Sequence, residues 1–434
     1  MNNQEKGDLG ERAVNELAFN TYLKYWCFPN PKNERRDKKE ICDLLILFKD
    51  TAIIISIKNY SFKGNYERYF RSTLKKANAQ INGAERKLFE KTKDIYIKHH
   101  ELGEIKFEPS NYPKVQRIII NLNDIPLFYP GGEKTFANKY AHIFNWEAFL
   151  GIVLELNTIP DLILYLEERE KVFKDYEMTI MKGNEDDWDV ETNKSFVNYK
   201  SEFHINKDFV LISGNEMDIL ADYLTFNRKF NEHFYSKEFN GAFFKLDENW
   251  NNYLERKEVK KKKEEDKASY FIDEFVKHEV LYKNDNFNIS LAQELLSLNR
   301  FERRIVGKSF LEFADRYNNI SGYYIARRYG KIDNLVIAFL MHGHQMKNDH
   351  VIVSMQLAID GYCFWGKYKS KKIILIAASN DLKKIKYGYT KDIKPFTKQR
   401  EKEIIEDLKL FNWFQNIENI HFNYKEYPDL KNVC

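Results

Sequence analysis

The stretch EICDLLILFKDTAIIISIK, residues 40–58, contains two short apolar runs at 41–48 and 51–57. Only Lys49 and Asp50 separate these runs. Two apolar runs of strand length around a two-residue connection are typical of a β-hairpin. We therefore expect a hairpin at the centre of the first domain, and we assign the neighbouring segments relative to it.

Polar residues gather at the open end of this predicted hairpin. The two-residue turn pairs Asp43 with Ser56, and because side chains alternate along a strand, Lys58 shares the face of Ser56. An acid and a lysine at the end of an apolar hairpin cost free energy unless they meet water, a metal or a substrate. This cost makes the three residues candidates for a functional site.

The segments around the hairpin indicate an α/β domain with a mixed sheet. Residues 8–24 carry a helical stripe of apolar positions, residues 66–98 have the pattern of a long helix, and the apolar run at 117–122 is typical of a buried strand. The predicted order is α-β-β-α-β. We expect this core to form a domain of residues 1–180.

The rest of the chain divides by composition. Two helices are expected within 145–173, because Pro160 is tolerated at a helix start but not inside a helix. Residues 181–254 are mixed and partly helical. Residues 255–267 contain seven basic and five acidic side chains, which predicts a solvated helix or linker. Residues 268–434 alternate helix and strand patterns and predict a C-terminal α/β domain for recognition, sensing or assembly.

Whole-chain composition excludes several classes of protein. The 434 residues are 43% hydrophobic, which suffices for folded domains, and a net charge of +4 says little about partners. We find neither a secretion signal nor the roughly 18 apolar residues of a membrane span. The cysteines lack a CxxC pair, so we expect no disulfide framework and a cytoplasmic location. A homo-oligomer is compatible with the sequence. The four cysteines are Cys27, Cys42, Cys363 and Cys434.

The segment after the hairpin is strongly basic within a nearly neutral chain. Residues 58–93 contain ten Lys and Arg against three Glu, with five aromatic residues interleaved between 60 and 70. Cations for phosphates and rings for stacking are typical of a nucleic-acid surface. The candidate phosphate contacts are Lys63, Arg68, Arg71, Lys75, Lys76 and Arg86. The interleaved rings are Tyr60, Phe62, Tyr66, Tyr69 and Phe70.

At these residues the chain resembles the PD-(D/E)xK, or restriction-endonuclease-like, nuclease superfamily. In that superfamily a helix glutamate, a strand aspartate and a (D/E)xK tripeptide assemble around Mg²⁺. The matching positions here are Glu11, Asp43 and SIK at 56–58, and Gln80 stands where many relatives carry a glutamine. The pattern is similar to a bacterial subgroup with serine in place of the usual acid. The resemblance covers about residues 7–90, and more weakly 297–310.

The resemblance implies a Mg²⁺-dependent or Mn²⁺-dependent nuclease whose favoured substrate is DNA, in a bacterial defence or genome-maintenance setting. It implies that Glu11, Asp43 and the carbonyl of Ile57 bind the metal, with the Ser56 hydroxyl contributing directly or through water. Lys58 would orient or deprotonate the attacking water and offset charge on the phosphate. Glu40 is an alternative source of the missing acid. Gln80 completes the predicted catalytic group.

Two alternatives to a nuclease stay open. The first is a catalytically weak or inactive nuclease-fold protein that binds nucleic acid or acts as a scaffold, with Ser56 marking the decayed site. The second is a sensor whose C-terminal domain binds a small ligand and gates the front domain.

Two further clusters have simple structural interpretations. We interpret three histidines as ordinary strand-end or loop residues, because no further ligand at convincing spacing joins them. Three arginines are expected on a solvated or salt-bridged helix face, with phosphate binding as the alternative. The histidines are His342, His344 and His350, and the arginines are Arg300, Arg303 and Arg304.

Overall fold

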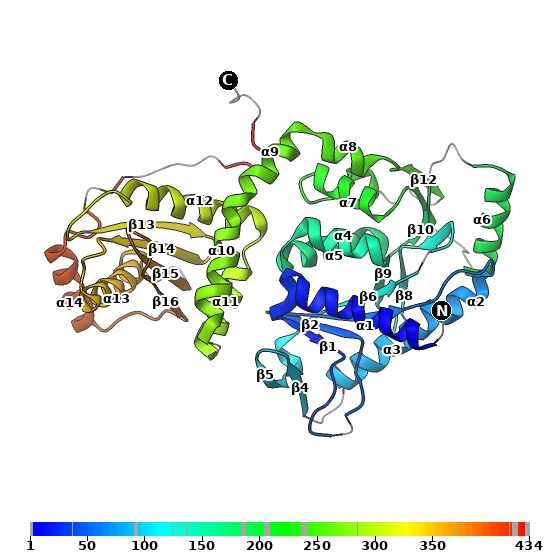
Figure 1. The fold of residues 1–434 in the computed structure, drawn as a ribbon, viewed down its shortest axis with the longest axis horizontal. Coiled ribbons are helices and arrows are strands. Elements are labelled where there is room, and N and C mark those ends of the chain that lie inside the picture. The colour runs from blue at the N-terminus through cyan, green and yellow to red at the C-terminus, as the bar shows by residue number, and fades with distance from the viewer. Residues whose placement is uncertain are drawn as a thin grey trace. The chain divides into compact units, whose positions relative to one another are not determined.

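The structure is a computed structural model, and it confirms the α/β fold class (Figure 1). Two compact units divide the chain at Val259 and Lys260. No helix in the described part of the chain has the length and apolar character to cross a membrane. The structure describes residues 3–36, 38–90, 94–123, 125–135, 137–183, 188–203, 209–235, 241–283, 285–369, 371–415, 417–418 and 424–429.

The predicted hairpin and its register are confirmed. Leu44 pairs with Ile55 and Phe48 with Thr51, which leaves Lys49 and Asp50 as the turn. The second hairpin strand runs parallel to the strand that contains the predicted run at 117–122. The six strands of this mixed sheet, in spatial order, are β1 (Cys27–Pro29), β2 (Leu44–Phe48), β3 (Thr51–Lys58), β6 (Lys114–Asn121), β9 (Tyr140–Asn145) and β8 (Gly132–Lys134).

Helices cover both faces of this sheet (Figure 1). On one face, α3 (Lys76–Glu85) packs against β3 and β6, so that Ile54 and Ile81 share one apolar core. This is the face on which Ser56 and Lys58 lie, because they alternate in step with Ile54. The other helices near this sheet are α1 (Asn3–Asn20), α2 (Tyr66–Phe70), α4 (Trp146–Leu156) and α5 (Ile159–Phe173).

The long helix predicted over 66–98 is too long. Its helical turns end at Glu90, and Ile95–His99 forms β4, which pairs with β5 (Gly103–Phe107). In β4 the buried positions are Ile95, Ile97 and His99. This period of two is typical of a strand, and it is the signal that the helical interpretation overlooked.

A second sheet completes the first unit and crosses the boundary expected at residue 180. Strand β10 (Glu177–Met181) pairs with β11 (Phe209–Ser213), so hydrogen bonds join the two sides of that boundary. The structure therefore extends the first unit to Val259. The remaining elements are β7 (Phe128–Pro130), α6 (Val190–Phe203), α7 (Glu216–Thr225), β12 (Ala242–Lys245) and α8 (Asn249–Glu255).

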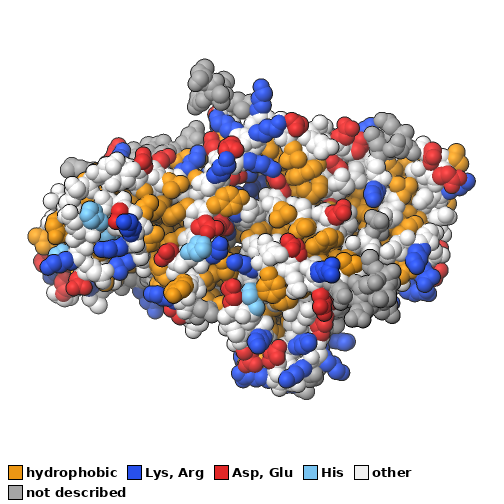
Figure 2. Space-filling model, viewed as in Figure 1, with side chains coloured by type: hydrophobic (Ala, Val, Ile, Leu, Met, Phe, Trp, Pro, Cys, Tyr) orange, Lys and Arg blue, Asp and Glu red, His pale blue; other side chains and the backbone are white. Residues whose placement is uncertain are grey.

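The charged block at 255–267 largely forms helix α9 (Lys257–Asp266). Lys and Arg side chains mix there with Asp and Glu side chains on the surface shown in Figure 2. Val259, the one apolar residue of the block, is fully buried. The block is therefore an ordered helix with one anchoring side chain.

The second unit repeats the core topology of the first, although no internal sequence repeat is evident. In both units a helix precedes an antiparallel strand pair, and a helical crossover then leads to a strand parallel to the second member. The elements are α10 (Tyr270–Phe275), α11 (Asn286–Leu296), α12 (Arg300–Tyr317), β13 (Ile325–Ile332), β14 (Leu335–His342), α13 (Asn348–Trp365), β15 (Lys372–Ser379), β16 (Ile385–Lys391) and α14 (Lys398–Leu410).

Candidate active site

The open end of the β2–β3 hairpin brings together the polar residues that the sequence places there. Asp43 directly precedes β2, and its position opposite Ser56 follows from the observed register. Lys58 is the last residue of β3. All three side chains face α3, whose exposed flank contributes Gln80.

Gln80 is the centre of this group. Its amide Nε2 donates to Asp43 Oδ1 over 2.8 Å. Its Oε1 accepts a hydrogen bond of 2.8 Å from the Ser56 hydroxyl and one of 2.5 Å from Lys58 Nζ. A carboxamide can fill both roles because it carries a donor and an acceptor. Gln80 therefore fixes the acid and the lysine relative to each other.

Asp43 is held from two sides. Its Oδ2 accepts a hydrogen bond from the backbone N–H of Ile57 and lies 3.9 Å from Lys58 Nζ. In an extended strand the N–H and C=O of one residue point to the same side, so the Ile57 carbonyl points toward the side of Asp43. The side chains of Asp43 and Lys58 are 19% and 18% exposed, so solvent reaches both.

The electrostatics of the site involve Glu40, which the sequence offered as the alternative acid. Burial, the negative charge of Asp43 and a side-chain hydrogen bond with it raise the pKa of Glu40, opposed by Lys32 and Lys58. Burial lowers the pKa of Lys58, while Asp43 and Glu40 act in the opposite direction. Two carboxyl groups and one desolvated ammonium therefore share one small region.

Ser56 is completely buried, and its hydroxyl donates to Gln80. Its role in this arrangement is to hold the Gln80 amide in position. The predicted direct or water-mediated metal contact of this hydroxyl is not tested by the structure and stays a prediction.

Glu11 lies outside this hydrogen-bonded group. Its side chain is exposed on α1, and the buried face of that helix begins two residues later at Ala13. Among the described side chains, no hydrogen bond or ion pair links Glu11 to Asp43 or Lys58, and Glu11 has no part in the pKa shift of Lys58. The prediction that Glu11 reaches the pocket stays a prediction, because two carboxylates that share a metal ion need no hydrogen bond to each other.

The predicted phosphate-binding cations are all exposed along α2, α3 and their flanking turns. None of the six forms an ion pair with an acidic side chain in the described part of the chain. Lys76 is close enough to Lys58 to lower its pKa. Lys76 therefore borders the site, and the exposed cations are available to an anionic ligand.

The aromatic part of the predicted nucleic-acid surface is wrong. Tyr66, Tyr69 and Phe70 are buried at 4 to 5% exposure and belong to the core between α2 and the sheet. Tyr60 and Phe62 are partly buried against the same core. Rings at helical spacing serve packing here, and they are not open to stacking with bases.

Sequence reasoning missed Asn121, the last residue of β6. Its Oδ1 accepts from the backbone N–H of Tyr60 over 3.3 Å, and its Nδ2 donates to the carbonyl of Tyr60 over 3.2 Å. Asn121 thereby fixes the chain just after Lys58, with which it is paired in the sheet. A polar residue closing the apolar run RIIIN was the available signal.

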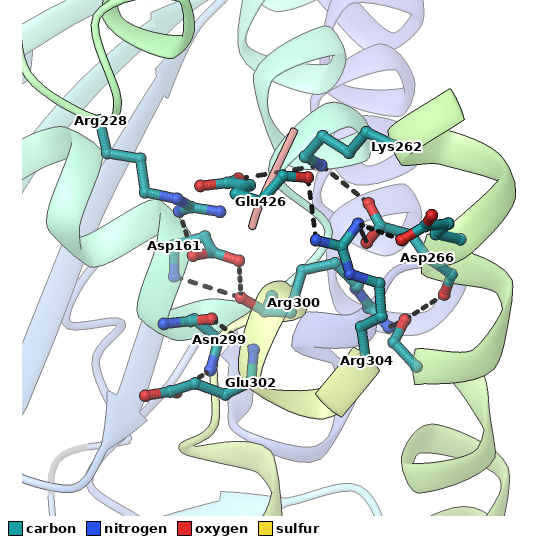
Figure 3. A network of polar contacts seen from close by, with 12 residues as sticks. Asp161, Arg228, Lys262, Asp266, Asn299, Arg300, Glu302, Arg304 and Glu426 are labelled. Carbon is teal, nitrogen blue, oxygen red and sulfur yellow. Dashed lines mark hydrogen bonds and ion pairs between the residues drawn. The ribbon is translucent and has the colours of Figure 1, made fainter. Parts of the chain in front are cut away.

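The arginine cluster of the second unit is structural. Arg300 and Arg303 share the carboxylate of Asp273 at 2.7 and 2.6 Å. Arg304 Nη1 lies 3.3 Å from Asp266, as Figure 3 shows. All three arginines are at most 4% exposed, so the salt-bridged interpretation holds, although the face is buried rather than solvated.

Two histidines of the second unit match their structural interpretation, whereas His350 does not, because it lies on helix α13 and not in a loop or at a strand end. His342 is buried at the end of β14, and His344 Nδ1 lies 3.2 Å from Asn380 Oδ1. Within the described residues, no group of three or more His, Cys, Asp and Glu side chains could hold a metal ion.

Comparisons of the chain with protein-family models, curated proteins and solved structures gave no match.

Proposed function

We propose that residues 1–259 form a metal-dependent nuclease that hydrolyses phosphodiester bonds, with DNA as the favoured substrate. The observation that carries this proposal is the hydrogen-bonded group of Asp43, Ser56, Lys58 and Gln80 at the open end of the hairpin. One amide orients an acid and a lysine, and this pair is open to solvent on one side. The pair provides the two charges that phosphoryl chemistry requires.

The oxygen atoms around Asp43 fit Mg²⁺ or Mn²⁺, since hard cations prefer carboxylate and carbonyl ligands. Asp43, the neighbouring Glu40 and the Ile57 carbonyl would hold the ion. The two carboxyl groups raise the free energy of each other's charged form, which a divalent cation would relieve. A bound ion would supply Lewis acidity toward the phosphate and the attacking water.

Lys58 would act on the phosphate and on the attacking water. Its ammonium is held by Gln80 Oε1 and lies beside Asp43, so its direction is fixed before substrate binds. The lowered pKa of Lys58 brings proton exchange with water closer to neutral pH than for an exposed lysine. In its charged form the same group would offset negative charge that develops on the phosphate.

The exposed cations supply the binding surface in this proposal. Charged side chains without acidic partners can neutralise phosphates directly, and each such contact releases counterions from the nucleic acid. Because the rings of this segment are buried, binding would be dominated by the phosphate backbone, with little base stacking.

A second candidate is a nuclease-fold protein that binds nucleic acid without cutting it. The complete burial of Ser56 favours it, because the side chain at the position of the superfamily's second acid is shielded from solvent. Both candidates share the cationic surface and differ in metal-dependent turnover.

A cleavage assay separates the two candidates. Plasmid and short DNA and RNA oligonucleotides are incubated with Mg²⁺, Mn²⁺ or EDTA and with wild type, Asp43→Ala, Lys58→Ala or Lys98→Ala. Lys98 is an exposed residue of β4 and serves as the matched control. The nuclease proposal expects metal-dependent cleavage by wild type and the control only. Cleavage by the two site variants at the wild-type rate would assign the activity to another site.

A further inference from the structure

The second unit contains a cavity of about 650 Å³ that follows the outer edge of β13. Its walls come from α12, β13, β14, Tyr362 of α13 and the segments 412–415 and 417–418. Pockets for small organic ligands in proteins have this size, whereas an eight-residue peptide strand would be about 26 Å long. The cavity therefore suits a compact ligand.

Arg327 gives the cavity its charge. The residue lies in the middle of β13, and no acidic side chain in the described part of the chain forms an ion pair with it. Burial lowers the pKa of Arg327, although a guanidinium stays protonated at physiological pH. A half-buried cation without a counter-charge costs free energy, and an anionic ligand would recover it.

Aromatic rings form one side of the same cavity. The Arg327 guanidinium lies 4.2 Å from the centroid of the Trp413 ring. Tyr362 lies next to Tyr329, with ring centroids 5.1 Å apart, and both line the cavity. Trp413 and Tyr362 are each 6% exposed, so their positions are fixed by packing. Rigid rings beside a guanidinium offer a planar ligand an apolar surface and a charge together.

The backbone of β13 offers hydrogen bonds to such a ligand. In its sheet β13 pairs only with β14, so alternate N–H and C=O groups of Ile325–Ile332 point away from the sheet. Four cationic side chains and one acidic side chain line the cavity. These are Arg316, Arg327, Arg328, Lys331 and Glu418. Arg316 pairs with Glu418 at 3.3 Å and Arg328 lies 3.7 Å from Glu312, so Arg327 and Lys331 are left without an acidic partner in the described chain.

We propose that this cavity binds a nucleotide, with the phosphate at Arg327, the base against the partly exposed ring of Tyr329, and the base edge on the β13 backbone. The second unit is then a ligand-binding module. This inference concerns residues 260–434 alone and does not rest on nuclease chemistry in the first unit.

Isothermal titration calorimetry of the full chain in EDTA tests the proposal. The probes are AMP, GMP and ATP, with adenosine and inorganic phosphate as separate arms. We expect at least one nucleotide to bind more tightly than either adenosine or phosphate, since these offer only half of the contacts. Arg327→Gln should weaken nucleotide binding about tenfold to a hundredfold, the value of a charge-assisted hydrogen bond.

Gly330 provides a second variant that partly fills the cavity. A Cβ atom built at Gly330 meets nothing within 4 Å, and the residue lines the cavity. Because side chains alternate along β13, a side chain at 330 lies on the face of Arg328, opposite Arg327. Gly330→Phe should therefore weaken nucleotide binding by filling that side of the cavity, while the unfolding temperature stays near that of wild type. Lys391→Gln on β16, the opposite edge strand, is the control and should bind as wild type does.

Failure of every probe to bind wild type would overturn the proposal. Equal nucleotide affinity in wild type and Arg327→Gln would overturn it as well, because the phosphate would then be held elsewhere. Arg327→Gln decides the question even if Gly330→Phe does not fold.

Discussion

Replacing Gln80 with alanine should destabilise the first unit by about 2–4 kcal/mol. The change removes one neutral hydrogen bond, from Ser56, worth roughly 0.5–1.5 kcal/mol, and two bonds to charged groups, worth about 1.5–3 kcal/mol each. Asp43 and Lys58 are partly exposed, so water would replace about half of their loss. Ser56 is fully buried and would lose its partner outright.

Urea denaturation of the full chain, followed by circular dichroism and tryptophan fluorescence, measures this loss. Ser56→Ala removes only the neutral bond and should cost less than Gln80→Ala, about 0.5–1.5 kcal/mol. Arg86→Ala follows α3 in sequence, is exposed and should leave the unfolding midpoint unchanged. The loss of stability should decrease in the order Gln80→Ala, Ser56→Ala, Arg86→Ala. This order is a stronger test than any single value.

The same variants test the nuclease proposal. Without Gln80, Lys58 and Asp43 lose their common partner, so we expect the cleavage rate of Gln80→Ala to fall about tenfold to a hundredfold. Gln80→Glu keeps an acceptor for Ser56 and Lys58 but faces Asp43 with a second negative charge. If Gln80→Ala unfolds at the wild-type urea concentration and cleaves at the wild-type rate, Gln80 does not organise this site.

Three further outcomes are expected. Burial raises the pKa of Glu133 from 4.5 to about 8, so the folded state binds this proton more tightly and stability falls as pH rises through that window. Urea unfolding is measured from pH 5 to pH 9. At the alkaline end, the free energy of unfolding of Glu133→Gln should exceed that of wild type by about 2–4 kcal/mol. The exposed Glu202→Gln should show no such increase. Reversing the charges of Lys75, Lys76 and Arg86 should reduce the slope of log affinity for DNA against log salt by roughly 2 to 3, measured by fluorescence anisotropy. Arg169→Met should lower the free energy of unfolding in urea by about 3–5 kcal/mol. The reason is that the fully buried carboxylate of Glu216 loses its ion-pair partner, which lies at 2.6 Å.

The hairpin could be predicted because local rules determine it. Its apolar runs, two-residue turn and alternating faces all lie within residues 40–58, and the observed register agrees residue for residue. Strand β4 was mistaken for helix because a real helical stretch over 66–90 comes shortly before it, and a short alternating run carries little weight beside so many helical turns. The second sheet escaped prediction because its strands come from four separated segments of the chain.

The candidate site was predictable where it depends on the hairpin and unpredictable where it depends on packing between elements. Asp43, Ser56 and Lys58 follow from the register alone. To place Gln80 in the site from local rules, the orientation of α3 would have to be known. The family resemblance placed Gln80 there instead. The place of Glu11 depends on the rotation of α1 about its axis, and the burial of Tyr66 and Phe70 depends on which side of α2 packs against α6. A single sequence fixes neither rotation.

The repeated topology shows how little of the function comes from the scaffold itself. In the first unit, Asp43 precedes one strand of the pair, and Lys58 ends the other. In the second unit, Tyr324 precedes β13 and His342 ends β14, with its Nδ1 lying 3.0 Å from the carbonyl of Gly343. Tyr324 stands where the first unit has Asp43, so the arrangement proposed to hold a metal in the first unit is not repeated there. The second unit instead has its cavity at the outer edge of β13, where a half-buried arginine lacks an acidic partner in the described chain. The chemistries that we propose for two units of one topology thus differ because side chains at strand ends and edges determine what each unit can bind.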